Sequence, residues 1–429
     1  MKTPTNPSDV VQATPPSVQI DVSPDELQLR AQGHVSELPR QFGAFATLSL
    51  AFSITNSWIG FSAVFATPLL AGGGPTIFFG LIVATIACSF ITAGLAELAS
   101  AFPSSGGQYH FAFMVSSPKY RAATAFTVGW LSVIAWCLIT ATAAVFCAQI
   151  VGNIASFLHP DYVWTQWQIY LIYVLLCTIA VAVVIWLPRQ IPMLEKVFFM
   201  ASIVGFVVFF ITVLATSKGK QSASTVFTKW DNQTGWSDGT AFLLGVGTYY
   251  GATIGCFLAS GRQTWTFARD NGLPHSKIFA KIHPTLQVPV NATFTTLIFC
   301  VLYGLIYIGS TTAYNSFINL SILSLNITYA IPQAVVVIRG RDKVLPKRQF
   351  NLGPVLGPIC NIFSAIWMLV FTVLFCFPVF LPVTLQNMNY LSVVVAAVCL
   401  FILILWWGGK RKTFEGPHVE LAGMEPLRQ

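Results

Sequence analysis

The sequence predicts an all-α integral membrane protein with about ten transmembrane helices. Only 9% of its 429 residues are charged, whereas soluble proteins carry about 25%. Hydrophobic residues make up 55% of the chain. They form continuous runs, unlike the short alternating strands of a membrane β-barrel. Because a helix needs about 20 apolar residues to cross the bilayer core, these runs predict membrane-spanning helices surrounded by lipid.

Ten runs are long enough to cross a bilayer, and each is expected to be one span. They lie at 43–70, 76–101, 122–151, 166–187, 197–216, 239–260, 290–309, 313–338, 355–381 and 389–408. Residues 42–409 therefore form one transmembrane domain. The segment 1–41 is polar, rich in Pro, Ser and Thr, and lacks the apolar core of a signal peptide, so it is expected to be a disordered tail. Residues 410–429 form a second polar tail.

The basic residues orient these spans. If the N-terminal tail is cytoplasmic, 20 of the 23 Lys and Arg residues fall in cytoplasmic segments, and only Lys218, Lys220 and Lys229 lie outside. Cytoplasmic loops of membrane proteins carry this excess of positive charge. We therefore expect both termini in the cytoplasm. The net charge of +8 is explained by these loops and predicts no nucleic-acid partner.

One loop on the predicted outer side carries a glycosylation sequon, Asn232-Gln233-Thr234. It predicts a glycan on Asn232 and a secretory route. We expect the plasma membrane, with the vacuolar membrane as the alternative.

The spans offer little for catalysis. All six His residues fall in tails or loops, and no cluster of His, Asp or Glu lies at membrane depth. We therefore expect no enzyme activity, no metal and no cofactor. Glu97, at the cytoplasmic end of the second span, is either a structural hydrogen-bonding residue, which we favour, or a proton-coupling group.

Backbone groups at an interrupted helix can form a binding site without charged side chains. The first span has a suitable break at Asn56, Ser57, Trp58, Ile59 and Gly60. The alternative is a continuous helix with small and polar residues at a packing seam. In the sixth span, Gly245 and Gly247 form the better hinge candidate. The glycines at 247, 251 and 255 recur every four residues, which favours close helix packing.

Five segments together resemble one known family. They are SITNSWIGFSAVFATPL (53–69), LAELASAFPSSGGQYHF (95–111), GWSDGTAFLLG (235–245), TWTFARDNGLP (264–274) and VPVNA (288–292). Their order and content resemble amino acid permeases of the amino acid–polyamine–choline superfamily, in particular the fungal GABA and choline permeases. The resemblance covers nearly the whole chain, from about residue 39 to 412.

The resemblance implies a fold of five-plus-five inverted repeats like that of the bacterial leucine transporter. In that fold the first and sixth helices are unwound around the substrate. The implied substrate-binding residues are Asn56, Ser57, Trp58, Ile59, Gly60, Gly245 and Gly247. The implied function is secondary active transport of a small amine or amino acid, such as GABA, choline or a polyamine, coupled to protons.

The chain departs from the family pattern after Gly251. Family members usually have twelve spans, but here the start of the sixth helix continues directly into the end of an eighth. The second repeat is therefore expected to be truncated. Both helices run from outside to inside, so the fusion preserves the topology.

This departure leaves two functional hypotheses. The first is a multi-pass secondary transporter. The second is a membrane protein that does not transport, either a sensor, an assembly partner or an inactive truncated permease.

Overall fold

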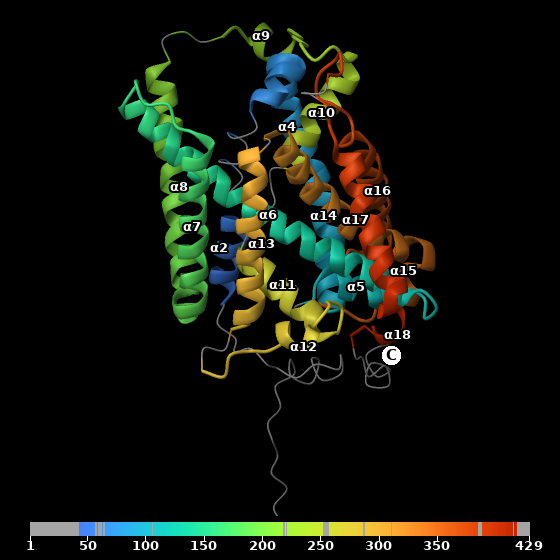
Figure 1. Ribbon diagram of the computed structural model, residues 1–429. Coiled ribbons are helices and arrows are strands. Elements are labelled where there is room, and N and C mark those ends of the chain that lie inside the picture. Colours follow the sequence, from blue (N-terminus) through green and yellow to red (C-terminus); the bar gives the residue numbers. More distant parts are fainter. Residues whose placement is uncertain are drawn as a thin grey trace, which may run out of the picture.

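The computed structural model describes residues 43–55, 58, 62, 65–104, 106–217, 219, 221–251, 257–285, 288–309, 311–384, 388–414 and 416–417. Every regular element within these residues is a helix (Figure 1). The predicted all-α membrane fold is thus confirmed.

Among its described residues, the first half of the chain contains five long or medium helices and three short ones. They are α2 (Ala44–Thr55), α4 (Ala66–Ala101), α5 (Gln108–Val115), α6 (Arg121–Leu158), α7 (Gln166–Trp186), η1 (Pro188–Gln190), α8 (Ile191–Thr216) and α9 (Ala223–Phe227).

The second half is also helical throughout its described residues. Its helices are α10 (Asp238–Gly251), α11 (Phe257–Arg269), α12 (Ser276–Phe279), α13 (Val290–Gly309), α14 (Thr311–Arg339), α15 (Arg341–Val344), α16 (Gly353–Leu374), α17 (Leu391–Leu405), η2 (Trp406–Lys410) and α18 (Arg411–Thr413).

Eight helices among the described residues are long and apolar enough to cross a membrane. They are α4, α6, α7, α13, α14 and α16, together with η1–α8 and the segment Leu391–Thr413. The predicted spans 43–70 and 239–260 do not each give one long described helix. The first contains α2, which ends at Thr55, and the sixth contains α10 and the start of α11. These are the two spans in which the sequence predicts an interrupted helix.

A sharp kink divides α4 near its start. Gly72 and Gly73 depart from helical geometry, and Gly73 has a φ of +69°, a conformation that glycine adopts readily. Pro75 follows directly, and its missing N–H makes it well suited to the first turn of a helix. The segment before the kink is therefore a short separate helix.

Helix α6 lies at the centre of the bundle and α8 at its periphery (Figure 1). The buried positions of α6 include many small residues, such as Ala125, Gly129 and Ser132, which let neighbouring helices approach closely. In α8, Ile191 is the one buried residue, and α2 is its main partner. The bundle is thus tightly packed around α6 and sparsely covered at α8.

Candidate functional site

The predicted break in the first span lies largely outside the described residues. Asn56, Ser57, Ile59 and Gly60 all fall there. Trp58 is described, and its indole N–H donates to the Ser202 hydroxyl of α8 at 2.9 Å. Its ring also contacts Phe206 and Phe209, with centroids 6.0 and 5.8 Å away. Trp58 is therefore held against α8.

Gly245 brings α10 against α4. A Cβ at Gly245 would lie 2.6 Å from Thr76 Cγ2 and 3.4 Å from Pro68 Cα, so only glycine permits this approach. Gly245 has a packing role here, and α10 continues as a helix through Gly247. The predicted hinge at this pair stays a prediction. The structure nevertheless places the sixth predicted span directly beside the end of the first.

The loop before α10 covers the kink of α4 at one end of the bundle. The Gln233 N–H donates to the Leu70 carbonyl at 2.9 Å, and the Asp231 N–H to the Gly72 carbonyl at 3.4 Å. At Gly74, a Cβ would lie 2.7 Å from the Val226 carbonyl oxygen. The loop thus packs closely over the ends of α4 and α10, and we call it the cap.

Within this cap, the side chain of Asn232 organises the turn. Its Nδ2 donates to the Trp236 carbonyl at 2.7 Å and to Asp238 Oδ1 at 3.0 Å. Its Oδ1 accepts from the N–H and hydroxyl of Thr234, which is buried. Asn232 therefore has a structural role, and its glycosylation stays a prediction.

At the opposite end, the two most distinctive motifs meet. Tyr109 of GGQYHF donates its hydroxyl to Asp270 of FARDNG at 2.8 Å, and their segments also pack through Tyr109 and Phe267, with ring centroids 5.4 Å apart. Gln263 Nε2 donates to the Gly106 carbonyl at 3.3 Å. Burial, together with the Asp270 carboxylate, raises the pKa of Tyr109 well above its usual range. Tyr109 therefore remains a hydrogen-bond donor to Asp270.

Glu97 forms a buried ionic cluster at the same end. Arg341 binds both of its carboxylate oxygens, with distances of 2.7 and 2.8 Å. Arg348 Nε donates to Oε1 at 2.8 Å, and the Leu352 N–H also donates to it at 3.2 Å. The cluster joins α4 to the α14–α16 connection. This agrees with the structural role that the sequence favoured for Glu97.

The two arginine partners of Glu97 were not predicted from the sequence. The basic segment 339–348 indicates only a cytoplasmic loop, because a run of Arg and Lys after a span is the ordinary topology signal. Two features of the sequence could have indicated these ion pairs. One is an acid at the end of an apolar helix, and the other is an excess of arginines in another loop. Such a buried charge requires a partner.

Comparison with known proteins identifies the architecture. The sequence profile of the amino acid permease family matches residues 45–256 and 240–399. This chain belongs to that family. The permease is 26% identical to a choline transporter of Saccharomyces cerevisiae, over 89% of this chain and 84% of the relative. It is 24% identical to a swainsonine transporter of Arthroderma benhamiae, over 86% and 90%. It is 20% identical to amino-acid permease BAT1 of Arabidopsis thaliana, over 92% and 96%. The permease is therefore a membrane transporter and not an enzyme.

The alignment with the choline transporter also shows that this permease is shorter than that relative over the matched region. It is 475 residues long but takes in 89% of this 429-residue permease, which is about 382 residues. About 93 residues of that relative, the difference between 475 and 382, therefore have no counterpart here. The two profile matches overlap at 240–256, which includes the junction after Gly251.

Proposed function

We propose that this permease is a secondary transporter that carries a small amine or amino acid across the membrane together with protons. The observation that best supports the proposal is the contact between α10 and α4 at Gly245. At this contact, Gly245 of the sixth predicted span lies against Pro68, near the end of the first. In the transporter fold that the sequence resembles, these two helices surround the substrate.

The proposed substrate site comprises Asn56, Ser57, Trp58, Ile59 and Gly60 with Gly245 and Gly247. Backbone groups freed at the end of a helix would hold the polar group of the substrate. The hydrogen bond from Trp58 to Ser202 supports this site, because it holds one of the proposed residues beside α8.

We further propose that both termini face the cytoplasm and that the permease resides in the plasma membrane. Helices α12 and α18, whose segments are rich in Lys and Arg, lie at one end of the bundle, and α9 lies at the other (Figure 1). This separation supports the predicted orientation. The loop with Asn232 would then be extracellular and open to glycosylation during synthesis.

Uptake of labelled choline and GABA into cells that express the permease tests the transport proposal. Saturable uptake is expected, with loss after addition of a proton uncoupler and in Gly60→Leu, because a bulky side chain would fill the proposed site. Gly219→Leu is the matched control, because no atom lies within 4 Å of an added Cβ in this loop before α9, and it should retain uptake. Absence of saturable uptake for every amine and amino acid tried would refute the proposal.

The second candidate is a membrane protein that binds but does not transport. The absence of counterparts for about 93 residues of the choline transporter favours it, because alternating access needs two complete bundles to move against each other. Sequencing the transcript across the codons for Gly251 and Ala252 separates the candidates. Additional in-frame sequence of about 90 residues, enough for two spans and their loops, would restore a twelve-span transporter. A direct junction favours binding without transport.

A further inference from the structure

Helix α8 carries an acidic residue inside a membrane-length helix. The sequence predicts this span to begin at residue 197, which leaves Glu195 in the preceding loop. In the structure the helix begins at Ile191, and the apolar segment Pro188–Thr216 is long enough to cross the membrane. Glu195 therefore lies in the second turn of the helix. A carboxylate at such a position is costly and is usually functional.

The carboxyl group of Glu195 has no charged partner among the described residues. Its Oε2 is buried and accepts no hydrogen bond from them. The hydroxyl of Ser53 on α2 is its polar neighbour. α2, the main helix packed on α8, contains no charged residue. Arg189 of η1 and Lys196 of α8 are the nearby bases, and neither forms an ion pair with Glu195.

Glu97 is a structural acid in this protein, and its partners can be compared with those of Glu195. Two guanidinium groups and a backbone N–H surround that carboxylate. A structural carboxylate is normally satisfied in this way, since an unpaired buried charge destabilises the fold. Glu195 lacks such partners, so a permanent structural ion pair does not account for it.

Glu195 faces the helix that leads into the proposed substrate segment. Ser202, which accepts the indole N–H of Trp58, follows Glu195 by seven residues. Seven residues are about two helical turns, so both lie on one face of α8, about 10 Å apart along its axis. Between them, Phe199 contacts Phe45 and Phe52 of α2, with ring centroids 5.8 and 4.9 Å apart. The carboxyl thus lies two turns from the anchor of Trp58.

We propose that Glu195 binds the cation of the transport cycle. This proposal rests on the transport function proposed above. Either a co-transported proton adds to the carboxylate and gives the neutral acid, or the ammonium group of the substrate pairs with the carboxylate. Both neutralise the carboxylate, and release of the cation on the other side of the membrane regenerates its charge. A carboxylate can bind either a proton or an ammonium group, and the experiment distinguishes between these two cations.

The experiment uses the full chain reconstituted in lipid vesicles, with labelled choline and labelled GABA as probes. Concentrative uptake is driven by a proton gradient in one assay, and exchange of internal for external substrate is followed without a gradient in the other. Glu195→Gln removes the charge and keeps the shape. Lys196→Gln, the exposed neighbour on the same helix, is the matched control and should match the unmodified protein in both assays.

If Glu195 binds the proton, Glu195→Gln should lose at least tenfold in gradient-driven uptake while exchange persists and becomes independent of pH. If Glu195 binds the ammonium group, the KM for choline should rise at least tenfold in both assays. Either result supports the proposal, and Glu195→Asp should restore part of the activity. Unchanged uptake, exchange and pH dependence in Glu195→Gln would overturn it.

A second measurement does not depend on transport. A hydrophobic carbodiimide modifies protonated carboxyl groups in apolar surroundings, and mass spectrometry locates the product. Modification of Glu195 is expected to increase as the pH falls and to decrease when choline is added if Glu195 binds the ammonium group. No modification at any pH would overturn the cation site even if Glu195→Gln fails to fold. If the unmodified permease neither takes up nor exchanges any substrate, the transport proposal fails, and the labelling still decides whether Glu195 takes up a proton.

Discussion

At the scale of single residues, charge balance at Glu97 controls the stability of one end of the bundle. Both the Glu97 and Arg341 side chains are almost fully buried. Glu97→Gln would leave the Arg341 guanidinium without its counter-charge, and breaking such a buried pair costs about 3 to 5 kcal/mol. We expect a clearly lower thermal unfolding midpoint in detergent for this variant. Lys343→Gln, an exposed change in the same connection, should leave the midpoint unchanged. Equal midpoints for the two variants would contradict the structural role.

Also at the residue scale, α10 and α4 can pack closely because Gly245 has no side chain. In Gly245→Ala the new methyl group would lie 2.6 Å from Thr76 Cγ2, and overpacking of this kind costs about 1 to 3 kcal/mol. We expect lower stability and lower uptake per molecule at the cell surface. Thr76→Ser removes the opposing methyl group, so the double variant should recover much of the loss. Gly239→Ala is the control, because no atom lies within 4 Å of its added Cβ. If Thr76→Ser does not restore the stability and uptake of Gly245→Ala, the contact with Thr76 is not the cause of the loss.

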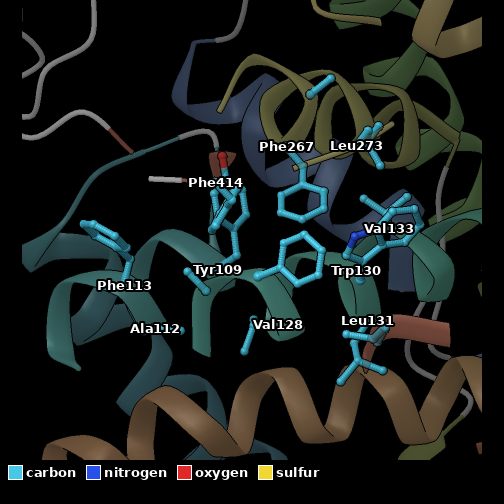
Figure 2. Packing of buried hydrophobic residues seen from close by; sticks show 14 of the residues in the cluster. Tyr109, Ala112, Phe113, Val128, Trp130, Leu131, Val133, Phe267, Leu273 and Phe414 are labelled. Atoms are coloured by element: carbon cyan, nitrogen blue, oxygen red, sulfur yellow. The ribbon is translucent and has the colours of Figure 1, made fainter. Parts of the chain in front are cut away.

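At the scale of elements, the segment that follows α17 packs against two other helices, α6 and α11. Phe414 lies close to Phe267, with ring centroids 5.9 Å apart (Figure 2). It also contacts Phe126, with ring centroids 5.3 Å apart. Lys410 Nζ donates to the carbonyls of Asn271 and Leu273 at 2.8 and 2.6 Å. Residues 410–414 therefore connect the end of the last helix to α6 and to the turn after α11.

Removing the aromatic ring of this segment tests the connection. Phe414 is almost fully buried, and a buried Phe→Ala change costs about 3 to 5 kcal/mol. Phe414→Ala should lower the unfolding midpoint and make the segment after α17 more sensitive to protease in permeabilised membranes. Trp407→Ala removes a larger ring that is 67% exposed, and it should have little effect on either measurement. Similar losses in both variants would show that the segment is not docked as described.

At the scale of the whole molecule, the sequence predicts the fold class well and the site poorly. Long apolar runs and sparse charge are sufficient for an all-α membrane protein, because the bilayer fixes both helix length and composition. The contacts that join the ends of the bundle are not local. Tyr109 and Asp270 are 161 residues apart, and Glu97 and Arg341 are 244 apart, so no periodicity along the chain brings them together. Glu195 was missed because the hydropathy of the span begins after it, whereas the helix begins before it.

The number of membrane crossings cannot be settled from local sequence patterns alone. Measuring the topology therefore tests the whole chain most directly. If the sixth and eighth helices are fused after Gly251, one outside-to-inside crossing replaces three. The loop that contains α12 then stays on the same side as both termini, in keeping with its bases Lys277 and Lys281. Epitopes inserted after Thr285 and after Gln429 should bind antibody only in permeabilised cells, and one inserted after Gly219 should bind it in intact cells. Antibody binding after Thr285 in intact cells would require one more or one fewer crossing before α13, and would remove the fused helix from the topology.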